Sequence, residues 1–307
     1  AYSAPAPVRA FFAILGAAAF ENSVISWAAA HRFHHRHVDT DDDPYNAQEG
    51  FFYSHMGWVM VEGAKHDDTS NVPDLWKDPI LRWQHRHAIV IGAVVNIVAT
   101  VALGLITGHM LGMFVLALLL RMVLTHHFTF LINSGAHMWG SQPYSTAHSA
   151  RDNWFLSFLS FGEGYHNYHH SFQADYRNGP RLYNWDPSKW LIWTMEKLGL
   201  ARAARAVDAL SEAMRDPSSE VRLSAARSLG MLGGTASARE LIHALRDTSH
   251  WSTLRLADIL AGLCHALARN FRSVIGKGKR FTPPILFQGG VNVHPGALGG
   301  HVTGQGN

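Results

Sequence analysis

The chain has 307 residues, of which 47% are apolar and 16% are charged, and its formal net charge is +3. Soluble globular chains carry about 25% charged residues, so this chain is poor in charge, and its length allows one or two domains with a sizeable core. The single cysteine, Cys264, excludes a disulfide framework and any cysteine-rich zinc or iron–sulfur site, and it fits a reducing compartment.

Three apolar stretches approach the length of a bilayer-crossing helix, which is about 20 residues for roughly 30 Å. Residues 88–107 carry no charge, and residues 110–132 follow them after a two-residue turn, so together they predict a helical hairpin. Residues 8–30 are rich in alanine and are interrupted by Arg9 and Glu21, which makes them a weaker span. The alternative is a set of buried helices in a soluble protein, but uncharged runs of this length favour a membrane.

The loops that flank these stretches differ in charge. The turn at 108–109 carries no basic residue, whereas the segment 31–87 carries Arg32, Arg36, Lys65, Lys77, Arg82 and Arg86. Basic loops tend to stay on the cytosolic side of a membrane, so we expect 31–87 to be cytosolic and the chain to return to the cytosol after residue 132. The sequence therefore predicts an integral, multi-pass membrane protein whose histidine clusters share the cytosolic face.

Histidine is over-represented, with 21 residues, and much of the excess forms short clusters, a composition that suggests metal binding. The segments 31–35 (HRFHH) and 166–170 (HNYHH) share the pattern His-x-x-His-His. Positions i, i+3 and i+4 share one face of a helix, so each segment predicts three converging imidazoles. A third element, Asn133 and His137, has the i, i+4 spacing and follows the last apolar stretch.

These elements supply eight candidate metal ligands: His31, His34, His35, Asn133, His137, His166, His169 and His170. Imidazole suits Zn, Cu, Fe and Ni, and a structural zinc site is complete with four ligands, so this number implies two metal ions. Two metals beside membrane helices, without redox cysteines, suggest iron and O2 chemistry. The sequence lacks the Glu and Glu-x-x-His set of carboxylate-rich soluble di-iron bundles.

At these residues the chain resembles the membrane fatty acyl-CoA desaturases of the stearoyl-CoA Δ9 type. The resemblance rests on segments 31–58, 130–140 and 161–179 and covers residues 1 to about 200. It implies an all-α membrane fold with a cytosolic di-metal domain, in which the histidines, and Asn133 through a water, hold two iron ions. It also implies O2-dependent insertion of a cis double bond into a long-chain acyl group. Electrons would come from cytochrome b5 or a ferredoxin-type carrier, with membrane lipid around the chain and no nucleic-acid partner.

One element of that family is not in the sequence. Its members carry an earlier box, His-x-x-x-x-His, which supplies two more ligands and would lie immediately before residue 1. The first residues also lack an initiator Met, and no cleavable signal peptide is visible. We therefore expect the chain as given to bind metal weakly or partially and to show no turnover.

The resemblance also assigns residues to an acyl tunnel, with ordinary helix packing as the alternative for each. These are Glu21, Asn22, Trp27, Thr129 and Phe130. Glu21 stands where the family has Gln, and Phe130 where it has Trp. Ala29 and Ala30 replace an Arg-Asp pair that contacts CoA in animal members, so acyl-CoA, an acyl-carrier protein thioester and an acyl lipid all stay open as the substrate.

Other polar residues near the clusters have two interpretations. Asp39, Asp43, Glu163 and Asp175 are candidates to orient ligand histidines, and solvation at the surface explains them equally well. We expect His148 to be a surface or interfacial residue, and we exclude His126 and His127 as ligands.

The character of the chain changes after about residue 200. Residues 205–263 repeat at an offset of 31, with identical residues such as Leu210 and Leu241 at helical spacing, which is typical of short HEAT-type repeats. Residues 276–307 are rich in Gly and Pro and predict loop or disorder. We expect a desaturase domain at 1–200, HEAT-like helical repeats at 205–270 and an irregular tail at 271–307.

Other functions remain open beside desaturation. Residues 258–271 and 276–291 weakly resemble the end of the ATPase activator of 2-hydroxyacyl-CoA dehydratases, but the earlier phosphate-binding loops are missing from the sequence, so we predict no ATPase activity. The same histidine scaffold supports di-iron hydroxylases, although the segment 162–170 favours desaturation. The alternative of another class is a non-catalytic membrane or scaffold protein that binds a partner through its helical repeats.

Overall fold

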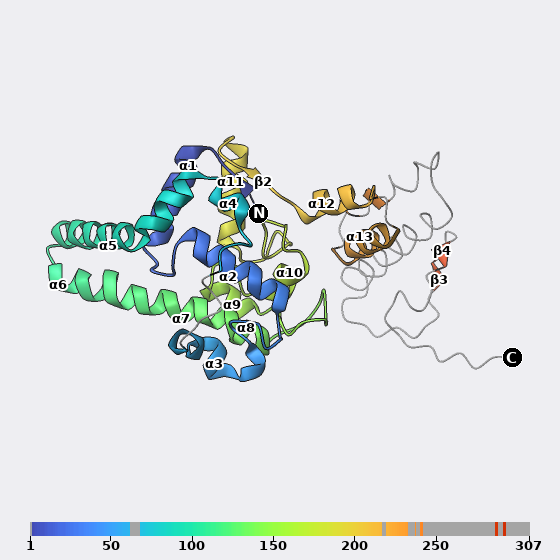
Figure 1. Ribbon diagram of the computed structural model, residues 1–307, viewed down its shortest axis with the longest axis horizontal. Coiled ribbons are helices and arrows are strands. Elements are labelled where there is room, and N and C mark those ends of the chain that lie inside the picture. Colours follow the sequence, from blue (N-terminus) through green and yellow to red (C-terminus); the bar gives the residue numbers. More distant parts are fainter. Residues whose placement is uncertain are drawn as a thin grey trace. The chain divides into compact units, whose positions relative to one another are not determined.

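The computed structural model describes residues 2–61, 68–216 and 219–232, together with residues 237, 240–241, 286–287 and 291–292. The chain divides into two compact units, Ala1–Ala203 and Ala204–Asn307. Helices dominate the described residues of both units (Figure 1), which confirms the predicted all-α class.

Two long apolar helices form a hairpin in the first unit. Helix α5 (Pro79–Thr107) begins where the Asp78 side chain accepts from the backbone N–H of Ile80, and it ends at Gly108, whose positive φ of 73° suits a residue without a β-carbon. The second helical run, Met110–Met138, comprises α6 (Met110–Met113), the π-helical η3 (Phe114–Leu120), α7 (Arg121–Asn133) and α8 (Gly135–Met138).

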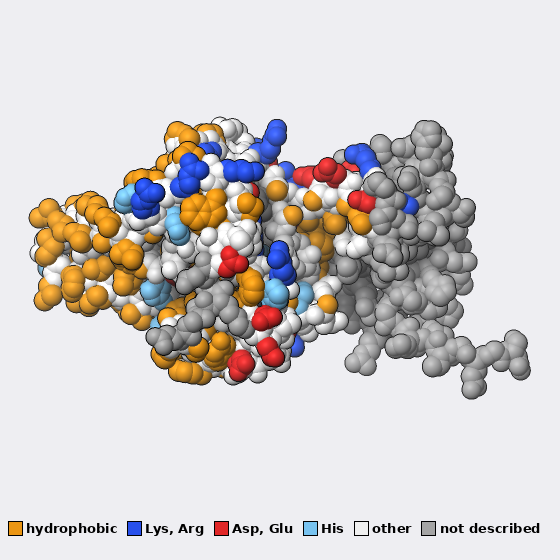
Figure 2. Space-filling view, viewed as in Figure 1, with side chains coloured by type: hydrophobic (Ala, Val, Ile, Leu, Met, Phe, Trp, Pro, Cys, Tyr) orange, Lys and Arg blue, Asp and Glu red, His pale blue; other side chains and the backbone are white. Residues whose placement is uncertain are grey.

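The hairpin presents its apolar side chains outward. Ile106 is 80% exposed and Leu111 is 76% exposed, and Figure 2 shows hydrophobic side chains over the hairpin that projects to the left. By length and composition both 29-residue helices can cross a membrane. The hairpin predicted from residues 88–107 and 110–132 is therefore present in the structure.

The stretch 8–30 does not form one helix, in contrast to the span expected there. Helix α1 (Ala6–Ala17) ends before Phe20 and Asn22, which both have positive φ values, and α2 (Val24–His37) begins after Ser23. The Ser23 hydroxyl oxygen accepts from the backbone N–H of Ser26 at 3.0 Å and so caps α2. A left-handed asparagine followed by a capping serine is a stop-and-restart signal, and it overrides the apolar composition on either side.

Polar side chains from the hairpin satisfy the open carbonyl groups at the end of α1. Asn96 Nδ2 donates to the carbonyl oxygen of Ala18 at 3.0 Å, and an Arg121 guanidinium nitrogen donates to Asn96 Oδ1 at 2.5 Å. His126 Nε2 lies 2.7 Å from the carbonyl oxygen of Ala19, to which it donates. The last carbonyls of a helix lack partners within it and are costly to leave bare in an apolar setting, so these three side chains fix α1 against the hairpin.

Short elements complete the first unit. They are β1 (Tyr2–Ser3), η1 (Ala47–Glu49), α3 (Phe51–His55), η2 (Gly57–Met60), α4 (Pro73–Trp76), α9 (Trp154–Leu159), α10 (His166–Ser171), α11 (Pro187–Lys197) and β2 (Arg202–Ala203). β1 pairs with β2 in antiparallel register, with Tyr2 opposite Ala203. A buried apolar cluster of Ala13, Ile25, Ala29, Val72 and Leu81 joins α1, α2 and α5 and holds α2 in place.

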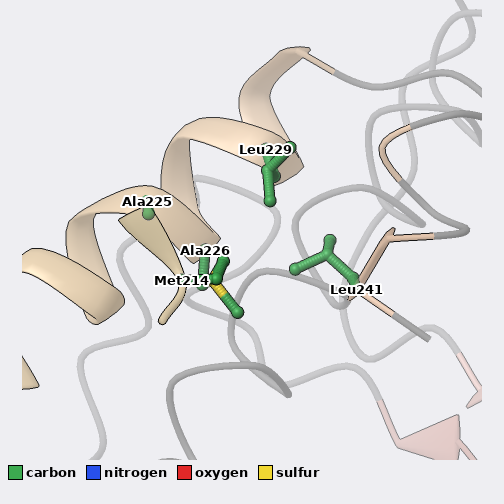
Figure 3. Close-up of a cluster of buried hydrophobic side chains, with 5 residues drawn as sticks. All are labelled: Met214, Ala225, Ala226, Leu229 and Leu241. Atoms are coloured by element: carbon green, nitrogen blue, oxygen red, sulfur yellow. The ribbon is translucent and has the colours of Figure 1, made fainter. Parts of the chain in front are cut away.

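The second unit is described by its first helices. α12 (Ala206–Ala213) and α13 (Ser219–Leu232) enclose a small apolar core of Met214, Ala225, Ala226, Leu229 and Leu241 (Figure 3). Its described residues also include the antiparallel strands β3 (Leu286–Phe287) and β4 (Val291–Asn292). Most of the expected later repeat, Cys264 and most of the tail 271–307 lie outside the described residues.

Candidate metal centre

Seven histidines from three elements, α2, α8 and α10, form two adjacent groups. We call His34, His137, His166 and His170 the four-histidine group and His31, His35 and His169 the three-histidine group; within each, the facing ring nitrogens lie within 4.8 Å of one another. The Nε2 atoms of His137 and His166 are 3.1 Å apart, and those of His35 and His169 are 2.9 Å apart. The first group is fully buried and the second is partly buried.

The two copies of His-x-x-His-His interlock between these groups. In α2 the i and i+4 residues, His31 and His35, enter the three-histidine group, while His34 enters the other group. In α10 the reverse holds, because His166 and His170 enter the four-histidine group and His169 enters the three-histidine group. On a helix, residues i and i+4 lie nearly above one another, and residue i+3 points in a different direction. The same His-x-x-His-His spacing in α2 and α10 therefore contributes to both histidine groups.

The geometry of the ring nitrogens fits metal ligation. A metal–imidazole bond is about 2.0–2.1 Å, so two such ligands at a right angle lie about 3 Å apart, as these Nε2 atoms do. Burial lowers the pKa of His31, His166 and His170 well below the usual value, and the neighbouring imidazoles lower it further. Burial likewise lowers the pKa of His169 to about 4. These four imidazoles are therefore neutral at physiological pH, which is the form that binds metals.

Two ligand candidates have a partner on their second ring nitrogen. His34 Nδ1 donates to Asp43 Oδ1 at 2.7 Å, and both residues are buried. His137 Nδ1 lies 2.7 Å from Ser149 Oγ. Such contacts keep the proton on Nδ1 and leave the Nε2 lone pair directed into the group, as second partners of metal-bound histidines commonly do.

The other acidic candidates serve different contacts. Asp175 accepts from the Tyr168 hydroxyl at 3.0 Å and from the Arg177 guanidinium at 2.7 Å. Glu163 Oε1 accepts from Asn178 Nδ2 at 2.7 Å, and loss of water around the Glu163 carboxyl raises its pKa to about 7. Asp175 thus joins α10 to the segment that follows it, and Glu163 joins the segment before α10 to Asn178.

A cavity of about 720 Å³ meets both histidine groups. His31, His34 and His166 line it, and the predicted tunnel residues Glu21, Asn22, Trp27, Thr129 and Phe130 all line it as well. Asn133 is also in its wall. The Trp27 ring stacks on His31 with ring centres 4.6 Å apart, which joins the cavity wall to the three-histidine group.

Sequence reasoning missed two residues that border the four-histidine group. Ser149 contacts His137, and the ring centre of His148 lies 5.2 Å from that of His170. The ring nitrogens of His148 are buried and have no hydrogen-bond partner among the described residues, although the residue as a whole is only partly buried. No spacing pattern marks either residue, because the loop that carries them reaches the site only through folding.

Comparisons with known proteins agree with these features. A family model described as fatty acid desaturase matches residues 2–188, and one described as HEAT repeats matches residues 186–261. A probable acyl-CoA desaturase of Schizosaccharomyces pombe is 43% identical over 203 residues, which are 66% of this chain and 42% of that protein.

Further relatives carry similar names. Acyl-CoA desaturase 1 of Saccharomyces cerevisiae is 40% identical over 202 residues, 65% of this chain and 40% of that protein. Stearoyl-CoA desaturase 5 of Homo sapiens is 38% identical over 208 residues, 65% of this chain and 62% of that protein. The chain thus spans less than two thirds of the length of the curated relatives it matches.

Proposed function

Because the chain belongs to the fatty acid desaturase family, we propose that it carries the catalytic site of an acyl-CoA desaturase. The reaction is the O2-dependent insertion of a cis double bond into a long-chain acyl group. The observation that carries this proposal is a single cavity that histidines of both groups line, His31 from the three-histidine group and His34 and His166 from the four-histidine group.

The cofactor in this proposal is a pair of iron ions, one at each histidine group, with Asn133 contributing through a water. Bound iron would supply O2 activation and the removal of hydrogens from an unactivated carbon chain. The chain's own contribution is seven imidazole side chains, four of them buried and three partly buried. Imidazole is compatible with iron and with other transition metals, so metal identity is part of the test.

The substrate in this proposal is an acyl-CoA, the class named in the relatives. Aromatic side chains such as Phe20, Trp58 and Phe130 line the cavity, and they would hold a hydrocarbon chain and exclude water from it. At its wall the imidazoles of His31 and His34 face the space that the chain would occupy. The position of the acyl chain relative to these imidazoles would decide which of its carbon atoms react.

The proposed setting is a multi-pass membrane protein with its histidine site on the cytosolic face. The exposed apolar hairpin of α5 and α7 supports membrane insertion, and the basic residues of the 31–87 segment support the orientation. A cytosolic site is accessible to acyl-CoA and to an electron donor such as cytochrome b5 or a ferredoxin.

The test is expression of the complete reading frame that contains this chain in a host that lacks its own desaturase, followed by lipid analysis. Wild type should restore cis-unsaturated acyl chains, whereas His34→Ala and His166→Ala should not. Hydroxylated chains in place of unsaturated ones would identify a hydroxylase. An unchanged lipid profile, with the protein correctly inserted and iron-loaded, would refute the proposal and favour a partner-binding role of the HEAT-like segment.

A further inference from the structure

A chain of hydrogen bonds connects Asp39 to His137 through Ser149. The Ser149 hydroxyl donates to Asp39 Oδ1, and the Ser149 backbone N–H donates to Asp39 Oδ2 at 2.6 Å. His137 Nδ1 lies 2.7 Å from Ser149 Oγ. Because a hydroxyl has one proton and the carboxylate already takes it, Ser149 Oγ can only accept from His137. The proton of His137 is therefore on Nδ1, and its Nε2 lone pair faces the four-histidine group.

The Asp39 end of this chain is held in an uncommon conformation. Asp39 has a φ of 63°, in the left-handed region that few residues other than glycine adopt. Its backbone N–H donates to Asp43 Oδ2 at 3.2 Å, and Asp43 Oδ1 accepts from His34. One turn after α2 thus serves two members of the four-histidine group, His34 directly and His137 through Ser149. Local strain that persists because the surroundings enforce it is a frequent feature of functional sites.

The Ser149 end is fastened to α10 by a buried amide. Asn167 Oδ1 accepts from the backbone N–H of Tyr144 at 2.8 Å, and Asn167 Nδ2 donates to the carbonyl oxygens of Ser145 at 2.7 Å and Ala150 at 2.9 Å. Asn167 is fully buried and lies between the ligand candidates of α10. The loop 144–150 is therefore a fixed part of the site, attached to the helix that carries His166 and to the turn that carries Asp39.

We propose that Asp39 and Ser149 are positioning residues for the metal centre: they fix the tautomer and the orientation of His137, so the metal affinity of the four-histidine group depends on the Ser149 hydroxyl. This inference rests on the proposed metal-binding function. Outer hydrogen-bond partners of ligand histidines typically contribute about 10- to 100-fold in metal affinity, and the same range is expected here.

The experiment compares wild type with Ser149→Ala, Ser149→Thr and Ser145→Ala. Ser149→Ala removes the hydroxyl, and Ser149→Thr keeps it. Ser145→Ala removes a hydroxyl from the same loop, whose oxygen accepts from the backbone N–H of Ala147 at 3.1 Å. The measurements are Fe2+ and Co2+ affinity by chelator competition, the visible absorption of the Co2+ form, and the melting temperature without metal. Ser149→Ala should lose about 10- to 100-fold in affinity and change the Co2+ spectrum, with a melting temperature close to wild type. Ser149→Thr and Ser145→Ala should resemble wild type.

Each other outcome has a definite meaning. Wild type that binds neither ion would refute the metal function itself. Wild type that binds metal, with Ser149→Ala equal to it in affinity and spectrum, would refute the positioning role alone. A Ser149→Ala variant that loses affinity and metal-free melting temperature together, without rescue by Ser149→Thr, would assign Ser149 a purely structural part and also overturn the inference.

Discussion

Buried imidazoles need a reason to be buried, and the proposed binding of metal would supply it. The four-histidine group places four rings in a water-poor space, where His166 Nδ1 has no partner among the described residues. An unpaired polar atom in such a place costs about 1–3 kcal/mol, and metal bonds at the facing Nε2 atoms would offset that cost. His34 and His137 reduce this cost through Asp43 and Ser149.

Loss of one buried imidazole should weaken metal binding more than loss of an outer partner. His166→Ala is expected to lower iron affinity by more than the roughly 100-fold upper range for outer partners, because it removes a ligand nitrogen from the centre of the four-histidine group. The measurement is iron content and affinity of the purified protein. His109→Ala, at the exposed tip of the hairpin, is the control, and an iron content equal to the control would contradict the assignment.

Glu163 should make stability depend on pH. Its folded pKa of about 7 lies above the ordinary value of 4.5, so the folded chain holds this proton over a range in which the unfolded chain has lost it. Stability from this group is complete below about pH 4.5 and falls as pH rises to 7. Glu163→Gln keeps an oxygen that accepts from Asn178 but cannot ionise. The melting temperature of the variant minus that of wild type should therefore increase as the pH rises from 5 to 8. A difference that is constant over this range would contradict the prediction.

Site residues that lie on one helix could be predicted from the sequence. Site residues that only folding brings together, from distant parts of the chain, could not. The repeated spacing of segments 31–35 and 166–170 was enough to expect that their imidazoles converge, and the structure brings them together. Ser149 and Asp39 are 110 positions apart, and nothing in either neighbourhood signals their contact. Whether the histidine groups bind metal stays a prediction.

Among elements, the hairpin could be predicted from composition, whereas the structure of the first apolar stretch could not. α5 and the run Met110–Met138 are long, uninterrupted and apolar, so length alone predicted them. In the stretch 8–30 the polar break at Glu21 and Asn22 decides the outcome, because Ser23 caps a new helix there. This break places Glu21, Asn22 and Trp27 in the cavity wall, which a continuous helix would not do.

The contact between α1 and α5 requires glycine at position 92. A β-carbon on Gly92 would collide with the carbonyl oxygen of Ala17. Gly92→Ala is therefore expected to destabilise the first unit by about 1–3 kcal/mol, the usual range for overpacking, as measured by thermal unfolding in detergent. Gly112→Ala is the matched control, because a β-carbon there would meet its nearest neighbour at 3.6 Å. Equal melting temperatures for the two variants would show that α1 does not pack on α5 this closely.

The whole chain combines a desaturase-family segment with a HEAT-like one. The family models match residues 2–188 and 186–261, and the structure divides between Ala203 and Ala204. The domain bounds expected from the sequence, 1–200, 205–270 and 271–307, stay a prediction. The pairing of β1 with β2 could not be predicted, because two-residue strands leave no periodic pattern.

The pairing of β1 with β2 also sets how far the chain can be shortened. A chain that ends at Ala203 keeps β2, whereas one that ends at Leu200 loses the partner of Tyr2 and Ser3. The first should bind iron and melt like the full chain, and the second should melt at a lower temperature because its β1 is unpaired. Thermal unfolding of the two truncated proteins measures this, and identical melting curves would show that the strand pair adds no stability.

Because α2 and α10 both contribute histidines to each group, the two proposed ion positions depend on each other. Each helix supplies ligand candidates to both histidine groups. A tilt or a shift of either helix would therefore disturb both groups at once. Gradual opening of the protein should therefore release both ions in a single event, and half-filled chains should arise from ligand substitution but not from partial unfolding.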